Sequence, residues 1–224
     1  MNLKEVMSAL KNYGTEQNRK IYKKHGVKTE LYGVSFANLS ILKKKIKVEH
    51  ELAQELWTTN NMDARTLAIM IADPNRLTSK EIDNWIKEVD YHLLADMIAG
   101  LVSKTSFAKK IYGKWIQSKK EYYKQAGYTI ISYLLKDTDS MTVSECKSIL
   151  KSIEKEIHQS PNRAKHSMNM TLIAIGIYKT ELTDIAKKTA EKIGKIEVDH
   201  GETSCKTPDA IQYIEKALKR TKKK

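Results

Sequence analysis

One carboxylate near the middle of the chain has neighbours that could take part in chemistry. Asp96 falls within an apolar segment whose spacing predicts a helix from 91 to 103. His92 lies four residues before it, and Ala99 and Ser103 lie three and seven residues after it, so all four share one helical face. A carboxylate on such a face can orient a water molecule or stabilise positive charge that develops on a bound substrate. The simpler alternative is a solvated carboxylate or a partner for a nearby lysine.

A second group of reactive side chains lies near the C-terminus, in Asp199, His200 and Cys205. A carboxylate, an imidazole and a thiol could bind a metal ion or form a Cys–His nucleophile. They fall short of a zinc pattern, because no second cysteine is near, and the spacing supplies no group that would orient His200. We therefore favour a structural turn in which Thr207 and Pro208 start the last helix, and we expect no metal or cofactor.

Basic residues precede two long apolar segments, 128–135 and 168–177. Both segments have helical spacing, so these residues should lie near helix N-termini, where free backbone N–H groups and the helix dipole favour phosphate. Taken one at a time, each residue is more often a solvated charge. The residues are Lys119, Lys120, Lys124, Arg163 and Lys165.

The elements that must position these side chains are helices. The chain has only 3 prolines and 9 glycines, and its apolar residues recur at intervals of three and four. The clearest case is Ala64, Leu67, Ala68 and Ile71, a narrow apolar stripe for which Asp63 is the predicted N-cap. The predicted helices span residues 2–13, 15–25, 36–46, 49–60, 63–72, 79–89, 91–103, 105–117, 119–136, 142–158, 162–178, 181–193 and 208–220.

Short amphipathic helices in successive pairs predict an all-α fold of stacked HEAT-like repeats, an α-α solenoid. We find no repeated sequence motif, so an irregular helical bundle remains the alternative. We predict a single HEAT-like repeat domain over 1–224, with a basic tail at 219–224. Residues 26–35 should form an extended connector, and residues 195–208 should form a loop.

The composition points to a polyanionic partner. The 224-residue chain carries 40 Lys and Arg against 27 Asp and Glu, a formal net charge of +13, which favours nucleic acid through counterion release, although solubility is the simpler explanation. Its two cysteines and the absence of a signal-peptide pattern predict a cytoplasmic protein. The longest apolar stretch, 168–178, is far shorter than the roughly 20 residues of a membrane span, so no membrane contact is expected.

Three N-terminal segments can be compared with known families, namely Leu31-Tyr-Gly-Val-Ser-Phe36, Glu55-Leu-Trp57 and Asp63-Ala-Arg-Thr-Leu-Ala68. They resemble the N-terminal part of the AlkD-like DNA alkylation repair family. The region from Val89 to Ile98 is similar to the aromatic-rich segment that ends in the family's functional Asp, and residues 199–208 look like a closing loop of a less characterised branch. Together with the N-terminal segments, the resemblance covers nearly the whole chain. It implies a superhelix of HEAT-like repeats that holds DNA in a basic concave groove and, in the best-known members, removal of N3- or N7-alkylated purines.

The resemblance also implies roles for individual residues. Asp96 would be the catalytic carboxylate, and one carboxylate suffices because a cationic alkylated base leaves as a neutral group, unlike the leaving group of ordinary sugar hydrolysis. Where active members carry tryptophans and an arginine, this sequence has His92, Asn169 and Gln125. Asn169 and Gln125 supply neither an aromatic face nor a positive charge. The further residues expected beside DNA are Tyr91, Lys120, Lys124, Arg163 and Lys165.

Three functions therefore stay open. The first is a DNA-binding alkylation repair protein, a glycosylase that excises N3- or N7-alkylated purines through Asp96. The second is a damaged-DNA binder without catalysis, and the third is a HEAT-like scaffold for an acidic protein. We expect double-stranded, alkylated DNA as the partner of a monomeric protein.

Overall fold

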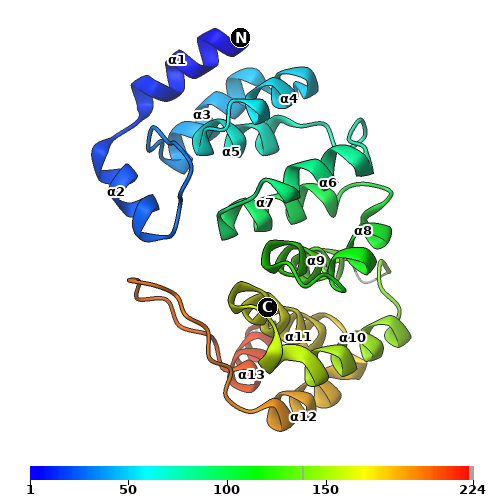
Figure 1. Ribbon diagram of the computed structural model, residues 1–224. Helices are drawn as coiled ribbons and strands as arrows, with labels where there is room; N and C mark the ends of the chain where they lie inside the picture. Colours follow the sequence, from blue (N-terminus) through cyan, green and yellow to red (C-terminus); the bar gives the residue numbers. More distant parts are fainter. Residues whose placement is uncertain (138, 222–224) are drawn as a thin grey trace. The chain divides into compact units, whose positions relative to one another are not determined.

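The structure, a computed structural model, describes residues 1–137 and 139–221. Within them it consists of α-helices that are mostly joined by short connectors, with longer segments before α3 and between α12 and α13 (Figure 1). Each predicted helix overlaps an observed one, so the all-α prediction is confirmed. None of the described helices is long and apolar enough to cross a membrane. The helices are α1 (Leu3–Tyr13), α2 (Glu16–Lys24), α3 (Phe36–Ile46), α4 (His50–Thr58), α5 (Met62–Ile71), α6 (Ser79–Lys87), α7 (His92–Val102), α8 (Ala108–Trp115), α9 (Glu121–Leu134), α10 (Val143–Glu156), α11 (Asn162–Tyr178), α12 (Thr183–Ile193) and α13 (Ala210–Thr221), with short 3-10 helices η1 (Ile157–Gln159) and η2 (Thr180–Leu182).

The chain divides into two compact units. The first comprises Met1–Phe107 with Gly201–Ser204, and the second comprises Ala108–His200 with Cys205 onward. In the first unit α5 contacts α3 and α7 in one layer, while α4 and α6 form a second layer that packs on α5 and α7. In the second unit α9, α11 and α13 form one layer, and α8, α10 and α12 form the other. The single domain expected from the sequence stays a prediction.

Two further predictions concern the connector before α3 and the basic tail. The extended connector predicted at 26–35 is confirmed, since this segment contains no helix. Of the predicted basic tail, Lys219 and Arg220 lie in the last turn of α13, and residues 222–224 lie outside the described residues. Cations in a last helical turn interact favourably with the helix dipole.

Helix α5 is buried on almost every side, because it contacts α3, α4 and α7. The buried surface of α5 is therefore wider than the predicted apolar stripe. The members of the stripe, Ala64, Leu67, Ala68 and Ile71, are all fully buried. The predicted N-cap is also wrong. The side chain of Asn61 caps α5 by accepting hydrogen bonds from the backbone N–H groups of residues 63 and 64.

Asp63 instead uses its buried carboxylate to hold the extended connector. The backbone N–H groups of Tyr32, Gly33 and Val34 donate to it over 2.6, 3.0 and 2.9 Å. Gly33 has φ +80°, and an added Cβ would lie 2.5 Å from the carbonyl oxygen of Thr15, so only glycine fits there. Burial raises the pKa of Asp63, and the three amide donors act in the opposite direction. The carboxylate thus ties the connector to the most buried helix of the first unit.

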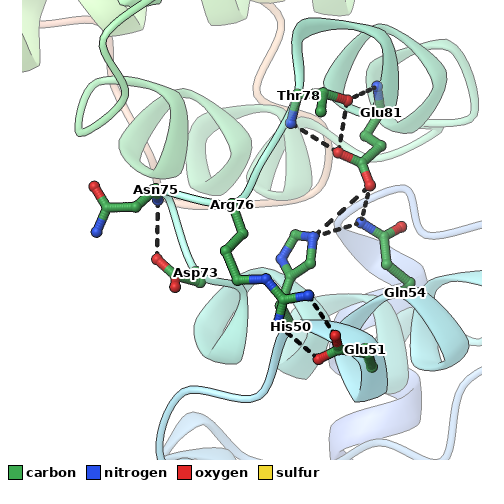
Figure 2. A network of polar contacts seen from close by, with 8 residues as sticks. All are labelled: His50, Glu51, Gln54, Asp73, Asn75, Arg76, Thr78 and Glu81. Atoms are coloured by element: carbon green, nitrogen blue, oxygen red, sulfur yellow. Dashed lines mark hydrogen bonds and ion pairs between the residues drawn. The ribbon is translucent and has the colours of Figure 1, made fainter.

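A polar network joins α4 to the start of α6 (Figure 2). Glu81 and Thr78 form a capping box at the N-terminus of α6. The same Glu81 carboxylate accepts a hydrogen bond from the Gln54 amide over 3.0 Å and lies 3.7 Å from Nε2 of His50. Side chains of α4 and of the N-terminal cap of α6 therefore hold two helices of one layer together.

The segment between α5 and α6 makes a second link in the same network (Figure 2). Arg76 donates two hydrogen bonds to the carboxylate of Glu51 on α4, and this partner lowers the pKa of Glu51 to about 2. The Asp73 side chain accepts from the backbone N–H of Asn75 over 2.9 Å, which stabilises the turn locally. The Arg76–Glu51 pair lies at the surface, where such pairs contribute little to stability.

In the second unit, α9 and α11 pack closely enough for direct contact between side chain and backbone. The hydroxyl of Thr171 on α11 lies 2.8 Å from the carbonyl oxygen of Tyr128 on α9, to which it donates. On α9, Gly127 permits a similarly close approach to the backbone at the end of α8, because an added Cβ would lie 2.8 Å from the backbone nitrogen of Ile116. Side chains on α9 and α11 are therefore held in fixed positions.

Candidate nucleic-acid interface

Helix α7 presents the predicted carboxylate at the surface of the first unit. Asp96 and His92 lie one turn apart and are both partly exposed, as is Ser103 after the end of the helix. Ala99 is fully buried, so the exposed part of this face is narrower than predicted. Besides Ser103, the face thus presents an imidazole and a carboxylate at i and i+4 spacing, which can act on the same bound group.

Tyr91 precedes α7 as its N-cap residue and is buried. Its ring meets the His92 ring edge-on, with centroids 4.6 Å apart and an interplanar angle of 71°. This geometry is favourable for aromatic pairs and orients the imidazole. It supports a positioning role for Tyr91 rather than a stacking surface of its own.

Two of the residues predicted to touch DNA lie inside the second unit, on α9. Lys124 is buried, and its ammonium group forms an ion pair of 2.8 Å with Glu156 of α10. The neighbouring Gln125 is also buried, with only 3% of its surface exposed. Because its charge is neutralised within the unit, Lys124 adds little to the attraction of a phosphate.

Asn169 is fully buried on α11. Its amide Nδ2 donates to the carbonyl oxygen of Pro208 over 2.9 Å, while Oδ1 accepts no hydrogen bond from the described residues. The side chain therefore fastens the segment that leads into α13. A base could reach Asn169 only after this segment had moved.

The other basic residues of the prediction lie at the surface near two helix N-termini. Lys120 is the exposed N-cap residue of α9, and its ammonium lies 5.4 Å from the centre of the Tyr123 ring. Arg163 and Lys165 are partly exposed in the first turn of α11. Lys119 is exposed beside Lys120. These cations are available to phosphate groups, in contrast to Lys124.

One acidic side chain already occupies the N-terminus of α11. Glu121, in the first turn of α9, accepts a hydrogen bond of 2.7 Å from the backbone N–H of Arg163. A carboxylate is the type of group that a helix N-terminus favours, so Glu121 competes with a phosphate for this position. Its charge also offsets the nearby cations.

We expect Glu121→Gln to raise the affinity for duplex DNA by about fivefold, because a repulsive charge at a few ångströms is worth on the order of 1 kcal/mol near a surface. Fluorescence anisotropy with labelled DNA would measure the change. Glu55→Gln, at an exposed position of α4, removes the same charge elsewhere and is the control. An equal gain in both variants, or no gain in either, would remove the N-terminus of α11 from the interface.

The loop after α12 is fixed by a two-point contact. The Asn162 side chain donates to the carbonyl oxygen of Asp199 over 2.6 Å and accepts from the backbone N–H of the same residue over 2.7 Å. The contact uses only the backbone of Asp199. The arrangement supports the structural interpretation of this loop. The last helix, however, starts at Ala210 and not at Thr207 and Pro208, because the Asp209 side chain accepts from the backbone N–H of Gln212 in its first turn.

The ring of His200 lies close to two other groups of the second unit. Its Nε2 is 3.1 Å from the Thr207 hydroxyl, and its ring meets that of His166 edge-on at 5.6 Å. Burial, followed by the proximity of His200, lowers the pKa of His166. Cys205 is exposed, and no group of three or more metal-binding side chains occurs among the described residues.

The positive charge of the chain is unevenly divided. The second unit carries 24 Lys and Arg against 13 Asp and Glu, whereas the first carries 16 against 14. Since the attraction of a polyanion grows with local charge density, the second unit is the better candidate for phosphate contacts. The candidate carboxylate and the main basic surface thus belong to different units.

Residues 6–214 match the model of a family described as DNA alkylation repair enzyme. The chain belongs to the DNA alkylation repair family. It is 35% identical over 221 residues to an uncharacterized protein of Listeria innocua, covering 96% of this chain and 95% of that protein. An uncharacterized protein of Listeria monocytogenes is 34% identical over 223 residues and 96% of each chain.

A solved structure resembles this member of the DNA alkylation repair family over nearly its whole length. The TM-score is 0.91 at 32% identity, and the match covers 99% of this chain and 95% of the other. That protein is described as one of a new family related to the HEAT-like repeat DNA glycosylases, with affinity for branched DNA structures. The HEAT-like fold and the family resemblance found in the sequence are therefore confirmed.

Proposed function

We propose that this protein of the DNA alkylation repair family binds branched DNA by contacting the sugar-phosphate backbone of the DNA, and that it does so without excising a base. The observation that carries the proposal is the burial of Asn169 and Gln125. The sequence resemblance implies that these residues occupy the positions where active relatives carry groups that flank the lesion, yet here both belong to the interior of the second unit. The affinity of the solved relative for branched DNA supports the same conclusion.

Electrostatics support phosphate contacts without base recognition. The surplus of cations in the second unit attracts any DNA, because phosphate contacts carry no sequence information. Exposed Lys120 and partly exposed Arg163 and Lys165 lie at helix N-termini, where backbone N–H groups add to the attraction. We further propose that the arms of the bound DNA are double-stranded and that the protein binds them as a monomer.

The residues that the resemblance puts at the positions of the aromatic cradle argue against efficient excision. An alkylated purine carries positive charge, and aromatic faces hold such a cation by cation–π attraction. Neither the Asn169 amide nor the Gln125 amide offers an aromatic face, and both are buried. A flipped base would therefore find a weaker site here than in active relatives.

Base excision remains a second candidate because Asp96 and His92 are both accessible on α7. The Asp96 carboxylate would stabilise the positive charge that forms on the deoxyribose as the base leaves, and it would orient the attacking water. The His92 ring, held by Tyr91, could stack beside the lesion. This chemistry needs no protonated second carboxyl group, because the cationic base departs as a neutral molecule.

The two candidates differ in one measurable product. We expect no release of 7-methylguanine or 3-methyladenine from alkylated duplex DNA beyond that seen with Asp96→Asn, together with tight binding of a four-way junction by both proteins. Chromatography of the released bases and anisotropy on the junction would measure the two effects. Base release by the wild-type chain that is lost in Asp96→Asn would establish the glycosylase instead. Failure to bind any DNA would favour a protein scaffold.

A further inference from the structure

A groove on the surface of the second unit is lined by lysines that the sequence analysis missed. It runs between α10 and α12, which lie side by side (Figure 1), and it has a volume of about 690 Å³. Apolar Leu150 and Ile185 form part of its lining, and Ile185 is exposed. The lysines are Lys147, Lys151, Lys155, Lys188 and Lys192.

The lysines follow both helices at regular spacing. Lys147, Lys151 and Lys155 are successive i+4 neighbours on α10, and Lys188 and Lys192 are i+4 neighbours on α12. All five are exposed. Like charges at this spacing destabilise a helix, so the arrangement does not serve the stability of the fold. A polyanion bound in the groove would remove the repulsion.

The groove contains almost no compensating negative charge. Among the described residues, one ion pair involves a lysine of the groove, and it joins Lys192 to Glu154 at 3.2 Å. The other acidic groups of α10 are engaged away from the groove, because Glu145 pairs with Lys109 and Glu156 pairs with Lys124. The remaining lysines of the groove form no ion pair among the described residues.

The groove lies on a different layer of the second unit from the cations already proposed. Lys120, Arg163 and Lys165 belong to α9 and α11, whereas the groove belongs to α10 and α12. The buried face of α10, with Cys146, turns away from the solvent that the lysines face. The second unit therefore carries two separate groups of exposed cations, one on each layer.

We propose that the α10–α12 groove binds the phosphate backbone of a second duplex arm, so that branched DNA is held at two surfaces and linear DNA at one. The inference rests on the proposed DNA-binding function and names the part of the molecule that distinguishes the two forms of DNA. A groove of exposed ammonium groups fits a phosphate backbone, which is recognised through charge and not through sequence.

The test compares a four-way junction with a linear duplex of the same sequence. In the triple variant Lys147→Gln, Lys151→Gln, Lys155→Gln, junction affinity should fall by about tenfold or more, and the slope of log affinity against log salt should decrease by about three. Linear duplex affinity should change by less than about threefold. Circular dichroism would verify that α10 remains folded, as expected when like charges are removed from a helix.

The matched control is Lys43→Gln, Lys44→Gln, Lys45→Gln, which removes the same charge from three exposed positions in the last turn of α3. Equal junction affinity in the two triple variants would overturn the inference and leave an acidic protein as the partner of the groove. Equal losses on junction and linear DNA would also overturn it, because the groove would then be a general DNA site. Failure of the wild-type chain to bind DNA would overturn the proposed function as well.

Discussion

Raising the salt concentration from about 50 to about 200 mM should weaken binding of a four-way DNA junction by about a thousandfold or more. Each lysine or arginine that contacts a phosphate releases a condensed counterion, and added salt opposes that release. The 24 basic residues of the second unit provide more than enough cations for the six to ten contacts that produce such a fall. Anisotropy titrations at several salt concentrations would measure the slope.

The same titration separates backbone binding from other modes of recognition. Binding dominated by a base in a pocket would respond weakly to salt, because few phosphates would be neutralised. A fall of less than about tenfold over the same range would therefore contradict the proposed binding mode. Repeating the titration with sodium glutamate in place of chloride would test whether anion binding to the protein contributes to the slope.

Asp63→Ala should lower the free energy of unfolding by about 3–5 kcal/mol, the largest stability effect that we expect from one polar side chain. The substitution leaves three backbone N–H groups, those of Tyr32, Gly33 and Val34, without their acceptor. Each unsatisfied buried donor costs about 1–3 kcal/mol, and water that enters the site would offset part of the sum. Urea unfolding monitored by circular dichroism would measure the loss.

Two other variants determine whether the amide contacts cause this loss. Asp63→Asn keeps one acceptor oxygen and should lose about half as much as Asp63→Ala. Asp73→Ala removes a carboxylate that accepts one backbone N–H at the surface, and it should cost no more than about 1 kcal/mol. Similar losses for Asp73→Ala and Asp63→Ala would show that the three amide contacts do not account for the stability of the connector.

The helices could be predicted because their signals are local. The spacing of apolar residues predicted a helix at 162–178, and α11 spans Asn162–Tyr178. A helix forms bonds only between residues four apart, so its period and its boundaries are visible within a short stretch of sequence. The exact N-cap residues were harder to predict. The sequence indicated Asp63 as the N-cap of α5, whereas the structure has Asn61 in that position. Both residues are good N-caps, and the choice depended on a connector about thirty residues away.

Tertiary structure decided whether each predicted site residue is exposed to a partner or buried inside a unit. Lys120 and Lys124 have the same chemistry and lie four residues apart, yet Lys120 is exposed and Lys124 is buried against Glu156. No pattern in the sequence links Lys124 to a partner 32 residues away. Likewise, the burial of Asn169 and its bond to Pro208 follow from the packing of the second unit.

The sequence by itself determined the helical class, the positions of the helices, the family and the excess of positive charge. Only the tertiary structure decided which charges are neutralised inside a unit and which remain for a partner. The spacing of lysines within α10 and within α12 is visible in the sequence, but their meeting in one groove is not. The physical reason is that periodicity and net charge are sums over local residues, whereas a surface or an ion pair depends on which distant segments pack together.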